Sequence, residues 1–457
     1  MPTPQETLDA AIALHTQGRL AEAVPLYREV LSVHPDHPDA LHLLGVIAHQ
    51  TGNHEQAATL IGQAIRRWGN AAIYHCNLGE ALRSLGRFDL ARAAHQQALR
   101  LDPRFVAAHN NLGTVYEQQG RYDEALACFN QAIALDPDCV DAHYNRARMW
   151  LALGNFDRGW AEYEWRWRRA EFTRPTLGQP EWDGTPLAGR RLLVRAEQGL
   201  GDTLQFARYV PLLQAQGAIV QFEVQPSLIP LLTHSGIGPL VVQGTSPAPF
   251  DVHATLLSLP GLLRTTLENI PAEVPYLAAD ETLVAQWRER LRGVSGFRVG
   301  IGWQGNPQFP HDRWRSMPLR EFAPLARVDG ARLVCLQKSF GLEQMAALGG
   351  AFEIADLRPD YDVEDGAFLN AAAILRNLEV LVTTDTALGH LAGALGARVW
   401  LLLSVGADWR WLADRCDSPW YPTMRLFRQS RHGDWSELMQ RVAAELTMEV
   451  NSARRPD

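Results

Sequence analysis

The strongest constraint on the fold is a glycine that recurs every 34 residues through the first third of the chain. Its copies are Gly18, Gly52, Gly86, Gly120 and Gly154. A small residue follows five positions after each copy, namely Ala23, Ala57, Ala91, Ala125 and Gly159. A fixed period of this length is typical of a solenoid, in which each repeat packs on its neighbours. We therefore predict a repeat array of about five copies, the last one modified, over residues 1–170.

The clearest copy spans residues 105–138 and reads FVAAHNNLGTVYEQQGRYDEALACFNQAIALDPD. Small Gly113 and Ala125 allow two antiparallel helices to approach closely, and Tyr116 and Phe129 fill the space between them. This pattern resembles the tetratricopeptide repeat family. The resemblance implies an α-helical solenoid with a groove that holds a protein or peptide. Scaffolding or homo-oligomerisation through the repeats is the alternative use.

Composition limits the class of partner and compartment. The formal net charge of −8 offers no sequence-wide basic field, so we expect no nucleic-acid partner. We find no secretory signal at the start, and no apolar run approaches the ~18 residues of a membrane span. The five cysteines are scattered without a zinc spacing, which is typical of a reducing compartment. We predict a cytoplasmic protein without a membrane span.

Residues 171–190 form an aromatic and proline-rich junction together with the residues just before them. Four tryptophans gather around it: Trp160, Trp165, Trp167 and Trp182. Large aromatic side chains usually pack into cores, so we interpret this segment as a wedge between domains. A platform that stacks on a sugar ring is the alternative.

Beyond the junction, apolar strand-like runs alternate with helical ones. The predicted strands are 192–194, 218–224, 239–242, 251–257, 298–303, 331–336, 352–354, 378–383 and 398–403. The predicted helices are 226–232, 260–267, 281–291, 367–375 and 387–395. This rhythm predicts two successive Rossmann-like α/β domains, 191–292 and 293–440, followed by a helix end and tail over 441–457. Ligands usually bind at the carboxyl ends of such strands.

Three motifs follow predicted strands. GLGD at residues 199–202 precedes a helix, DTALGH at residues 385–390 opens another, and NPQFPHDRWRSMP at residues 306–318 lies in a loop. With these motifs the chain resembles GT-B glycosyltransferases of the bacterial heptosyltransferase-like group (glycosyltransferase family 9), and distantly the protein O-GlcNAc transferases. The resemblance implies a GT-B fold with an acceptor-side first domain and a nucleotide-sugar-side second domain. It also implies inverting, metal-independent transfer of a sugar to a hydroxyl group.

By this resemblance, Asp202 is the general base that takes the proton of the acceptor hydroxyl, and Gly201 of the same loop is one of the donor-binding residues. A carboxyl whose pKa is raised by burial suits that role. The alternative interpretation is a helix cap, because an acidic residue at a helix start satisfies free backbone amides.

The resemblance also implies a set of residues that bind the donor phosphates. Asp385 and Thr386 would hold the diphosphate at a helix N-terminus, where free amides and the helix dipole favour anions, and His390 would support them. Arg315 would neutralise the leaving diphosphate, with Arg313 as the competing assignment.

Gln337 and Lys338 look like the pair that contacts donor phosphates in the O-GlcNAc transferases. Lys338 is the single lysine of the chain and follows a predicted strand. A solvated loop lysine is the alternative.

Two further patterns are interpreted as structural or left open. Asp360-Tyr361-Asp362 imitates the DxD metal motif of another glycosyltransferase fold, and we interpret it as a solvated acidic loop, so we expect no metal and no cofactor. Four aromatic residues either flank a nucleotide base or pack in the core: Trp409, Trp411, Trp420 and Tyr421.

Taken together, the sequence predicts a glycosyltransferase that uses a nucleotide-sugar donor and a hydroxyl acceptor on a protein or peptide recruited by the repeats. The alternative is a tetratricopeptide interaction scaffold with a degenerate, non-catalytic glycosyltransferase domain. A nicotinamide oxidoreductase is disfavoured, because GLGD lacks the third glycine of a dinucleotide-binding loop.

Overall fold

The computed structural model describes residues 2–309, 312–357 and 366–454. These residues form two compact units. The repeat unit comprises Met1–Met149 and Glu162–Phe172, and the α/β unit comprises Trp150–Ala161 and Thr173–Asp457. Part of the predicted fifth repeat therefore belongs to the α/β unit, and the predicted boundary at residue 170 is too simple.

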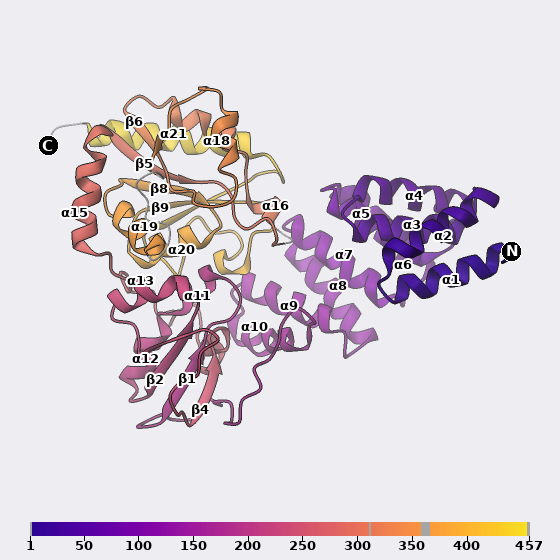
Figure 1. Ribbon diagram of the computed structural model, residues 1–457, viewed down its shortest axis with the longest axis horizontal. Coiled ribbons are helices and arrows are strands. Elements are labelled where there is room, and N and C mark those ends of the chain that lie inside the picture. The colour runs from indigo at the N-terminus through magenta and orange to yellow at the C-terminus, as the bar shows by residue number, and fades with distance from the viewer. Residues whose placement is uncertain (1, 310–311, 358–365, 455–457) are drawn as a thin grey trace. The chain divides into compact units, whose positions relative to one another are not determined.

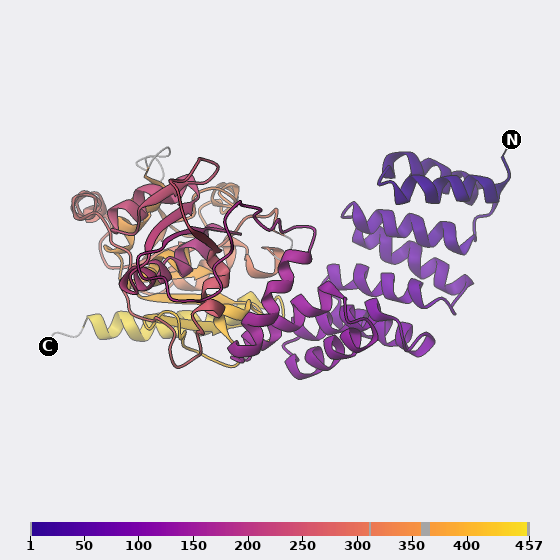
Figure 2. The same cartoon turned by 90° about the horizontal axis from the view of Figure 1, so that it is seen from below.

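The repeat region is built from helices in antiparallel pairs (Figures 1 and 2). They are α1 (Pro4–Thr16), α2 (Leu20–Val33), α3 (Pro38–Gln50), α4 (His54–Arg67), α5 (Ala72–Ser84), α6 (Phe88–Leu101), α7 (Val106–Gln118), α8 (Tyr122–Leu135), α9 (Val140–Ala152) and α10 (Phe156–Tyr163). The predicted helical solenoid is confirmed.

The periodic glycines lie at the turn inside each pair. Each has a positive φ, from 71° at Gly120 to 83° at Gly52. Glycine adopts this left-handed conformation without the steric cost that a Cβ brings. The predicted close approach of the paired helices is also confirmed, since a Cβ on Gly113 would lie 2.6 Å from the ring of Phe129. The 34-residue period thus reports one turn and one tight helix contact per repeat.

The first sheet of the α/β unit has four parallel strands in the order β3-β2-β1-β4. The strands are β1 (Arg191–Arg195), β2 (Ile219–Val224), β3 (Leu240–Val242) and β4 (Val252–Thr255). The helices that accompany them are α11 (Leu200–Phe206), α12 (Tyr209–Ala215), α13 (Ile229–His234) and α14 (Leu259–Leu262). The apolar centre of β1 is buried, as expected for a central parallel strand.

The second sheet has six parallel strands in the order β10-β9-β8-β5-β6-β7. They are β5 (Phe297–Gly302), β6 (Ala331–Cys335), β7 (Ala355–Asp356), β8 (Val380–Thr384), β9 (Val399–Leu403) and β10 (Met424–Arg428). The helices of this part are α15 (Glu281–Arg290), α16 (Asp312–Arg315), α17 (Ala323–Ala326), α18 (Glu343–Ala347), α19 (Ala367–Leu375), α20 (Ala387–Ala394) and α21 (Trp435–Ala453). Two parallel sheets with helices make this unit α/β, as predicted.

Several predicted boundaries differ from the structure. The strand predicted at 352–354 is misplaced, because β7 comprises the next two residues, Ala355–Asp356. The helix predicted at 260–267 ends at Leu262. Strand β10 was not predicted. Helix α21 crosses the predicted boundary at residue 440, because Leu438, Val442 and Leu446 pack into the core of the second sheet. The second domain therefore extends through this helix.

The junction tryptophans are divided between the two units, and two of them are buried. Trp160 and Trp182 are buried in the α/β unit, where the Trp160 indole donates to the carbonyl of Thr265 at 3.0 Å. In the repeat unit Trp165 stacks on His143 with ring centroids 3.7 Å apart. Packing within each unit is therefore the observed use, rather than one common aromatic platform.

Candidate active site

The GLGD loop connects β1 to α11 and carries Asp202 into the first turn of that helix. The helix begins at Leu200, two residues before Asp202. The Asp202 carboxylate reaches back and accepts a hydrogen bond of 2.8 Å from the backbone amide of Gly199. Asp202 therefore stabilises the helix start, which is the structural role that the sequence left open.

The DTALGH segment connects β8 to α20. Thr386 is the residue that precedes the helix, and its backbone is extended, with a φ of −141°. Its hydroxyl makes no capping hydrogen bond, so it does not occupy the amides of the first turn. The hydroxyl of Thr384, the residue before Asp385, is buried without a hydrogen-bond partner among the described residues. The start of α20 therefore has hydrogen-bonding groups that a ligand could use.

The two motifs meet through Gly201. A Cβ built on Gly201 would lie 2.8 Å from Cδ2 of His390 and 3.5 Å from Cα of Ala387. Helices α11 and α20 accordingly pack against each other, and Figure 1 shows them side by side where the two sheets' parts join. Glycine is required here because any side chain would push the loop away from α20. The structure thus brings an acid of the first sheet to the helix start of the second.

An arginine that the sequence analysis did not single out completes this junction. Arg410 lies in the loop after β9, and one nitrogen of its guanidinium (Nη2) donates to Oδ1 of Asp202. The other, Nη1, donates to Oδ1 of Asp408 at 2.8 Å. The Arg410 side chain is only 8% exposed, and its guanidinium lies 4.2 Å from the Trp409 ring centroid. The available signal was an arginine between two tryptophans in the segment that follows a predicted strand.

Burial changes the titration of both acids of the motifs. Burial raises the pKa of Asp202 above its ordinary value, although the positive charge of Arg410 opposes the shift. Burial also raises the pKa of Asp385, to about 6, against the charge of Arg315. The negative charge of Asp408 adds to both upward shifts. With a pKa of about 6, Asp385 can exchange a proton close to neutral pH.

His390 is a buried, neutral member of the group. Its Nδ1 lies 3.0 Å from the Tyr421 hydroxyl, and its ring stacks on Trp411 with centroids 5.1 Å apart. Burial, followed by the charge of Arg410, lowers the pKa of His390 to about 3. The imidazole therefore carries no positive charge near neutral pH, and it supports the start of α20 by packing and hydrogen bonding.

The structure separates the two candidate arginines of the 306–318 loop. Arg315 pairs with Asp312 at 3.1 Å and is 28% exposed. Its charge also acts on Asp202 and Asp385. The guanidinium of Arg313 lies over the Trp314 ring at 4.5 Å. Arg315 is thus brought to the acids of both motifs.

Gln337 and Lys338 follow β6 and differ in accessibility. Gln337 is buried, and its amide nitrogen donates at 2.8 Å to the carbonyls of Gln304 and Phe340. Its amide oxygen accepts from the backbone of Trp303 and Gln304. Both hydrogen bonds of the amide nitrogen therefore go to backbone carbonyls, and the phosphate contact expected of Gln337 stays a prediction. Lys338 is exposed at the carboxyl edge of the sheet.

The remaining sequence patterns have structural roles or cannot be described. The aromatic residues considered as nucleotide contacts are all buried in the core: Trp409, Trp411, Trp420 and Tyr421. The segment 360–362 lies outside the described residues. Within the described ranges, no group of three or more His, Cys, Asp or Glu side chains could hold a metal ion. No helix in these ranges is long and apolar enough to cross a membrane.

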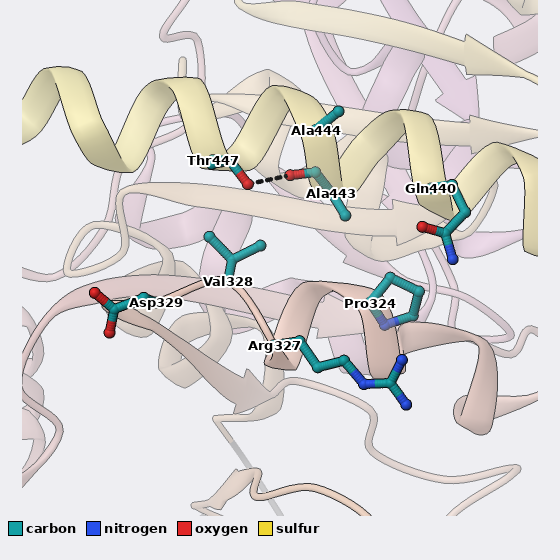
Figure 3. Close-up of a pocket in the computed structure, with 8 residues that line it drawn as sticks. All are labelled: Pro324, Arg327, Val328, Asp329, Gln440, Ala443, Ala444 and Thr447. Atoms are coloured by element: carbon teal, nitrogen blue, oxygen red, sulfur yellow. Dashed lines mark hydrogen bonds between the residues drawn. The ribbon is translucent and has the colours of Figure 1, made fainter.

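A separate surface pocket of about 420 Å³ lies between α17 and α21 (Figure 3). It is lined by Pro324, Arg327, Val328, Asp329, Gln440, Ala443, Ala444 and Thr447. The lining residues just after α17 precede β6, so the pocket lies at the amino end of that strand. Ligands of open α/β sheets bind at the opposite, carboxyl edge, where the two motifs meet.

Comparison with known proteins identifies the first part of the chain. Profiles of the tetratricopeptide repeat match residues 8–72, 106–139 and 140–159, and a TPR repeat profile matches residues 79–120. The first third of this chain is a tetratricopeptide-repeat array.

Three solved structures are similar to part of this chain. MamA is 20% identical and covers 38% of this chain and 97% of its own, with a TM-score of 0.32. TTC0263 of Thermus thermophilus is 25% identical and covers 37% of this chain and 93% of its own, with a TM-score of 0.33. YrrB, described as having an unusual peptide-binding site, is 21% identical and covers 36% of this chain and 86% of its own, with a TM-score of 0.31.

One curated relative reaches beyond the repeats. Protein FlbA of Caulobacter vibrioides is 27% identical over 317 residues, which cover 63% of this chain and 52% of FlbA. The chain therefore spans about half the length of this relative. The matched share is larger than the repeat unit, so part of the match lies in the α/β unit.

Proposed function

We propose that the α/β unit is a metal-independent, inverting GT-B glycosyltransferase that moves a sugar from a nucleotide-sugar donor to a hydroxyl group. The observation that carries this proposal is the contact of Gly201 with His390, which joins the acidic loop after β1 to the start of α20. A base on one α/β half and an anion site on the other are what a transfer between two bound substrates requires.

In this reaction Asp202 acts as the general base. The acceptor hydroxyl loses its proton to the Asp202 carboxylate while its oxygen forms a bond to the anomeric carbon. The bond between that carbon and the diphosphate oxygen breaks, and the nucleoside diphosphate leaves with the electron pair. The attack comes from the face opposite the leaving group, so the configuration inverts. A carboxyl with a raised pKa is a stronger base than an exposed one.

The start of α20 stabilises the leaving group. Its free amides and the Thr386 hydroxyl donate to the diphosphate, and Arg315 supplies positive charge. Asp385 would repel a diphosphate as an anion, but its pKa of about 6 allows it to take up a proton when the donor binds. Lys338, exposed at the same sheet edge, is proposed as a further phosphate contact.

The repeats recruit the acceptor in this proposal. Asn145 donates to Asn110 at 3.0 Å, and Asn110 donates to Asn111 at 3.2 Å, so the first helices of successive repeats share a polar strip. Such a strip can pair with the polar groups of a peptide. The acceptor is then a hydroxyl on a protein or peptide.

A thermal-shift panel with UDP-, GDP-, ADP- and CMP-sugars tests the proposal. A ligand at about 100 times its Kd stabilises a protein by about 2.7 kcal/mol, so one donor class should raise Tm clearly. Asp202→Asn should keep this shift and lose about 10²- to 10⁴-fold in turnover, the usual contribution of a general base. If none of the donors raises Tm, the enzyme function is contradicted and the scaffold function is favoured. Normal turnover of Asp202→Asn would reject the role of Asp202 as the base but would leave the transferase function standing.

A further inference from the structure

The ion pair of Asp202 with Arg410 ties the proposed base to a cation of the other half of the α/β unit. Arg410 is shared with Asp408, whose side chain is 32% exposed, whereas the Asp202 side chain is 17% exposed. Solvent and ligands can thus reach the carboxylates beside a guanidinium that is itself almost buried.

The loop that carries Arg410 is held firmly in place. Leu412 has a φ of 55°, an unfavourable value for a residue with a branched side chain, which persists only where neighbouring contacts impose it. Arg428 donates to the carbonyls of Trp411 at 2.7 Å and Leu412 at 2.6 Å. Within the α/β unit, the Ala413 amide donates to the carbonyl of Ala152 at 2.7 Å. These contacts hold the backbone of the Arg410 segment in place, so an exchange of partners would involve the Arg410 side chain rather than the backbone.

The observed pairing is unfavourable for general-base catalysis. One Asp202 oxygen accepts from Arg410 and the other from the Gly199 amide. Both contacts favour the charged carboxylate and so weaken its affinity for a proton. A base needs the opposite during transfer, when it must take the proton of the acceptor.

We propose that Arg410 is a second diphosphate-binding arginine, and that donor binding moves its Nη2 from Asp202 to the diphosphate, which frees Asp202 to act as the base. This inference rests on the proposed transferase function. It makes the donor the first substrate to bind productively, because the proton affinity of Asp202, already raised by burial, increases further once Arg410 has moved.

The charges around the site favour this exchange. The field of Arg410 reaches Asp385 and His390 at the start of α20, where the diphosphate is proposed to lie. A diphosphate carries more charge than one carboxylate, so it competes well with Asp202 for the Nη2 group of the guanidinium. Asp408 keeps its bond to Nη1 at 2.8 Å, so Arg410 stays anchored while Nη2 turns. Arg315 and Arg208 are the other cations whose charges act on this group.

Inorganic pyrophosphate is the probe, because it carries the part that all nucleoside diphosphates share. Calorimetric titration of the full chain should show that Arg410→Gln weakens pyrophosphate binding by about 10- to 100-fold, as expected for loss of a charged hydrogen-bond donor. Arg410→Lys should restore part of this loss, since it keeps the charge without the fork. Arg415→Gln is the matched control. Arg415 pairs with Asp417 in the same region and is 39% exposed, so its removal should leave the affinity unchanged.

Competition between Asp202 and the ligand gives a sharper readout. Asp202→Asn should tighten pyrophosphate binding. This increase in affinity should be larger in the protein that keeps Arg410 than in the protein that also carries Arg410→Gln. The double variant removes the charge of both members of the Asp202–Arg410 ion pair. It therefore also avoids leaving the Asp202 carboxylate buried without its cation. Titrations in buffers of different ionisation heat, at about pH 6, should show proton uptake on binding that decreases in Asp202→Asn.

The outcomes separate this inference from the function on which it rests. If nucleotide-sugars bind to the natural protein but Arg410→Gln binds pyrophosphate as tightly, the role of Arg410 is rejected and the transferase stands. If Asp202→Asn tightens pyrophosphate binding equally with and without Arg410, the proposed exchange of Arg410 partners is rejected. The same holds if Asp202→Asn leaves the proton uptake on binding unchanged. If neither pyrophosphate nor any nucleotide-sugar binds, both proposals fail.

Discussion

The buried imidazole of His390 should make the α/β unit sensitive to acid, and His390→Gln should remove that sensitivity. The pKa of His390 falls from its ordinary 6.5 to about 3 in the folded protein, first because it is buried and then because Arg410 is near. At pH values between these two pKa values, the His390 imidazole is protonated in the unfolded chain and neutral in the folded chain. Stability therefore decreases as the pH falls through 6.5, and increases as it rises.

The size of the effect follows from the two pKa values. Each pKa unit corresponds to about 1.4 kcal/mol, so lowering the pH from about 7 to about 5 should cost about 2 kcal/mol through this residue. Glutamine does not titrate. His390→Gln should lose stability at every pH, because the ring stacked on Trp411 is gone, but its loss between the two pH values should be about 2 kcal/mol smaller than that of the natural protein.

Urea unfolding followed by tryptophan fluorescence measures this difference at each pH. Most tryptophans of the chain lie in the α/β unit, so the signal reports mainly on that unit. Leu391→Ala is the matched control on the same helix. It removes a fully buried side chain that does not titrate, and it should cost about 2 to 5 kcal/mol equally at both pH values. Equal pH dependence of His390→Gln and the natural protein would refute the buried, neutral imidazole.

Three further substitutions test other parts of the structure by the same unfolding measurement. Gly52→Ala should destabilise the repeats by about 1 kcal/mol because φ is +83°. Gly62→Ala, inside α4, should stabilise by up to about 1 kcal/mol, because its Cβ would meet only the Arg66 side chain, at 3.8 Å. Equal effects would reject the left-handed turn. Gly201→Ala places a Cβ 2.8 Å from the imidazole ring and should cost about 1 to 3 kcal/mol, whereas Gly178→Ala meets nothing within 4 Å and should cost little. Asp385→Asn should stabilise the protein at about pH 7.5 by up to about 3 kcal/mol, because the pKa of about 6 means that the folded state disfavours the charged carboxylate. Destabilisation there would contradict the raised pKa.

Local patterns in the sequence determined the elements that depend on near neighbours. The glycine period predicted the helix pairs because each turn needs a left-handed residue at the same place, and Gly18 to Gly154 all adopt it. Buried central strands such as β1 and β8 were predicted because parallel strands covered on both faces are continuously apolar. Edge strands β7 and β10 were misplaced or missed, because each has one neighbour and a shorter apolar signal.

The candidate site divides in the same way. The sequence identified Asp202 and the segment with Thr386 and His390, because a strand, a tight turn and a helix start leave a local pattern. It did not identify Arg410 as the partner of Asp202, because 208 residues separate them. Nor did it show that the amide nitrogen of Gln337, which it assigned to a ligand, donates to two backbone carbonyls in the tertiary fold.

The sequence by itself thus determined the repeats, the two α/β halves and the acid that follows the first strand of the first half. Only the tertiary structure decided that Gly201 lies against His390, that Arg410 reaches across to Asp202, and that burial shifts the pKa values of these groups. Periodicity and turn chemistry are properties of neighbouring residues, whereas ion pairing and desolvation depend on which distant segments the fold brings together.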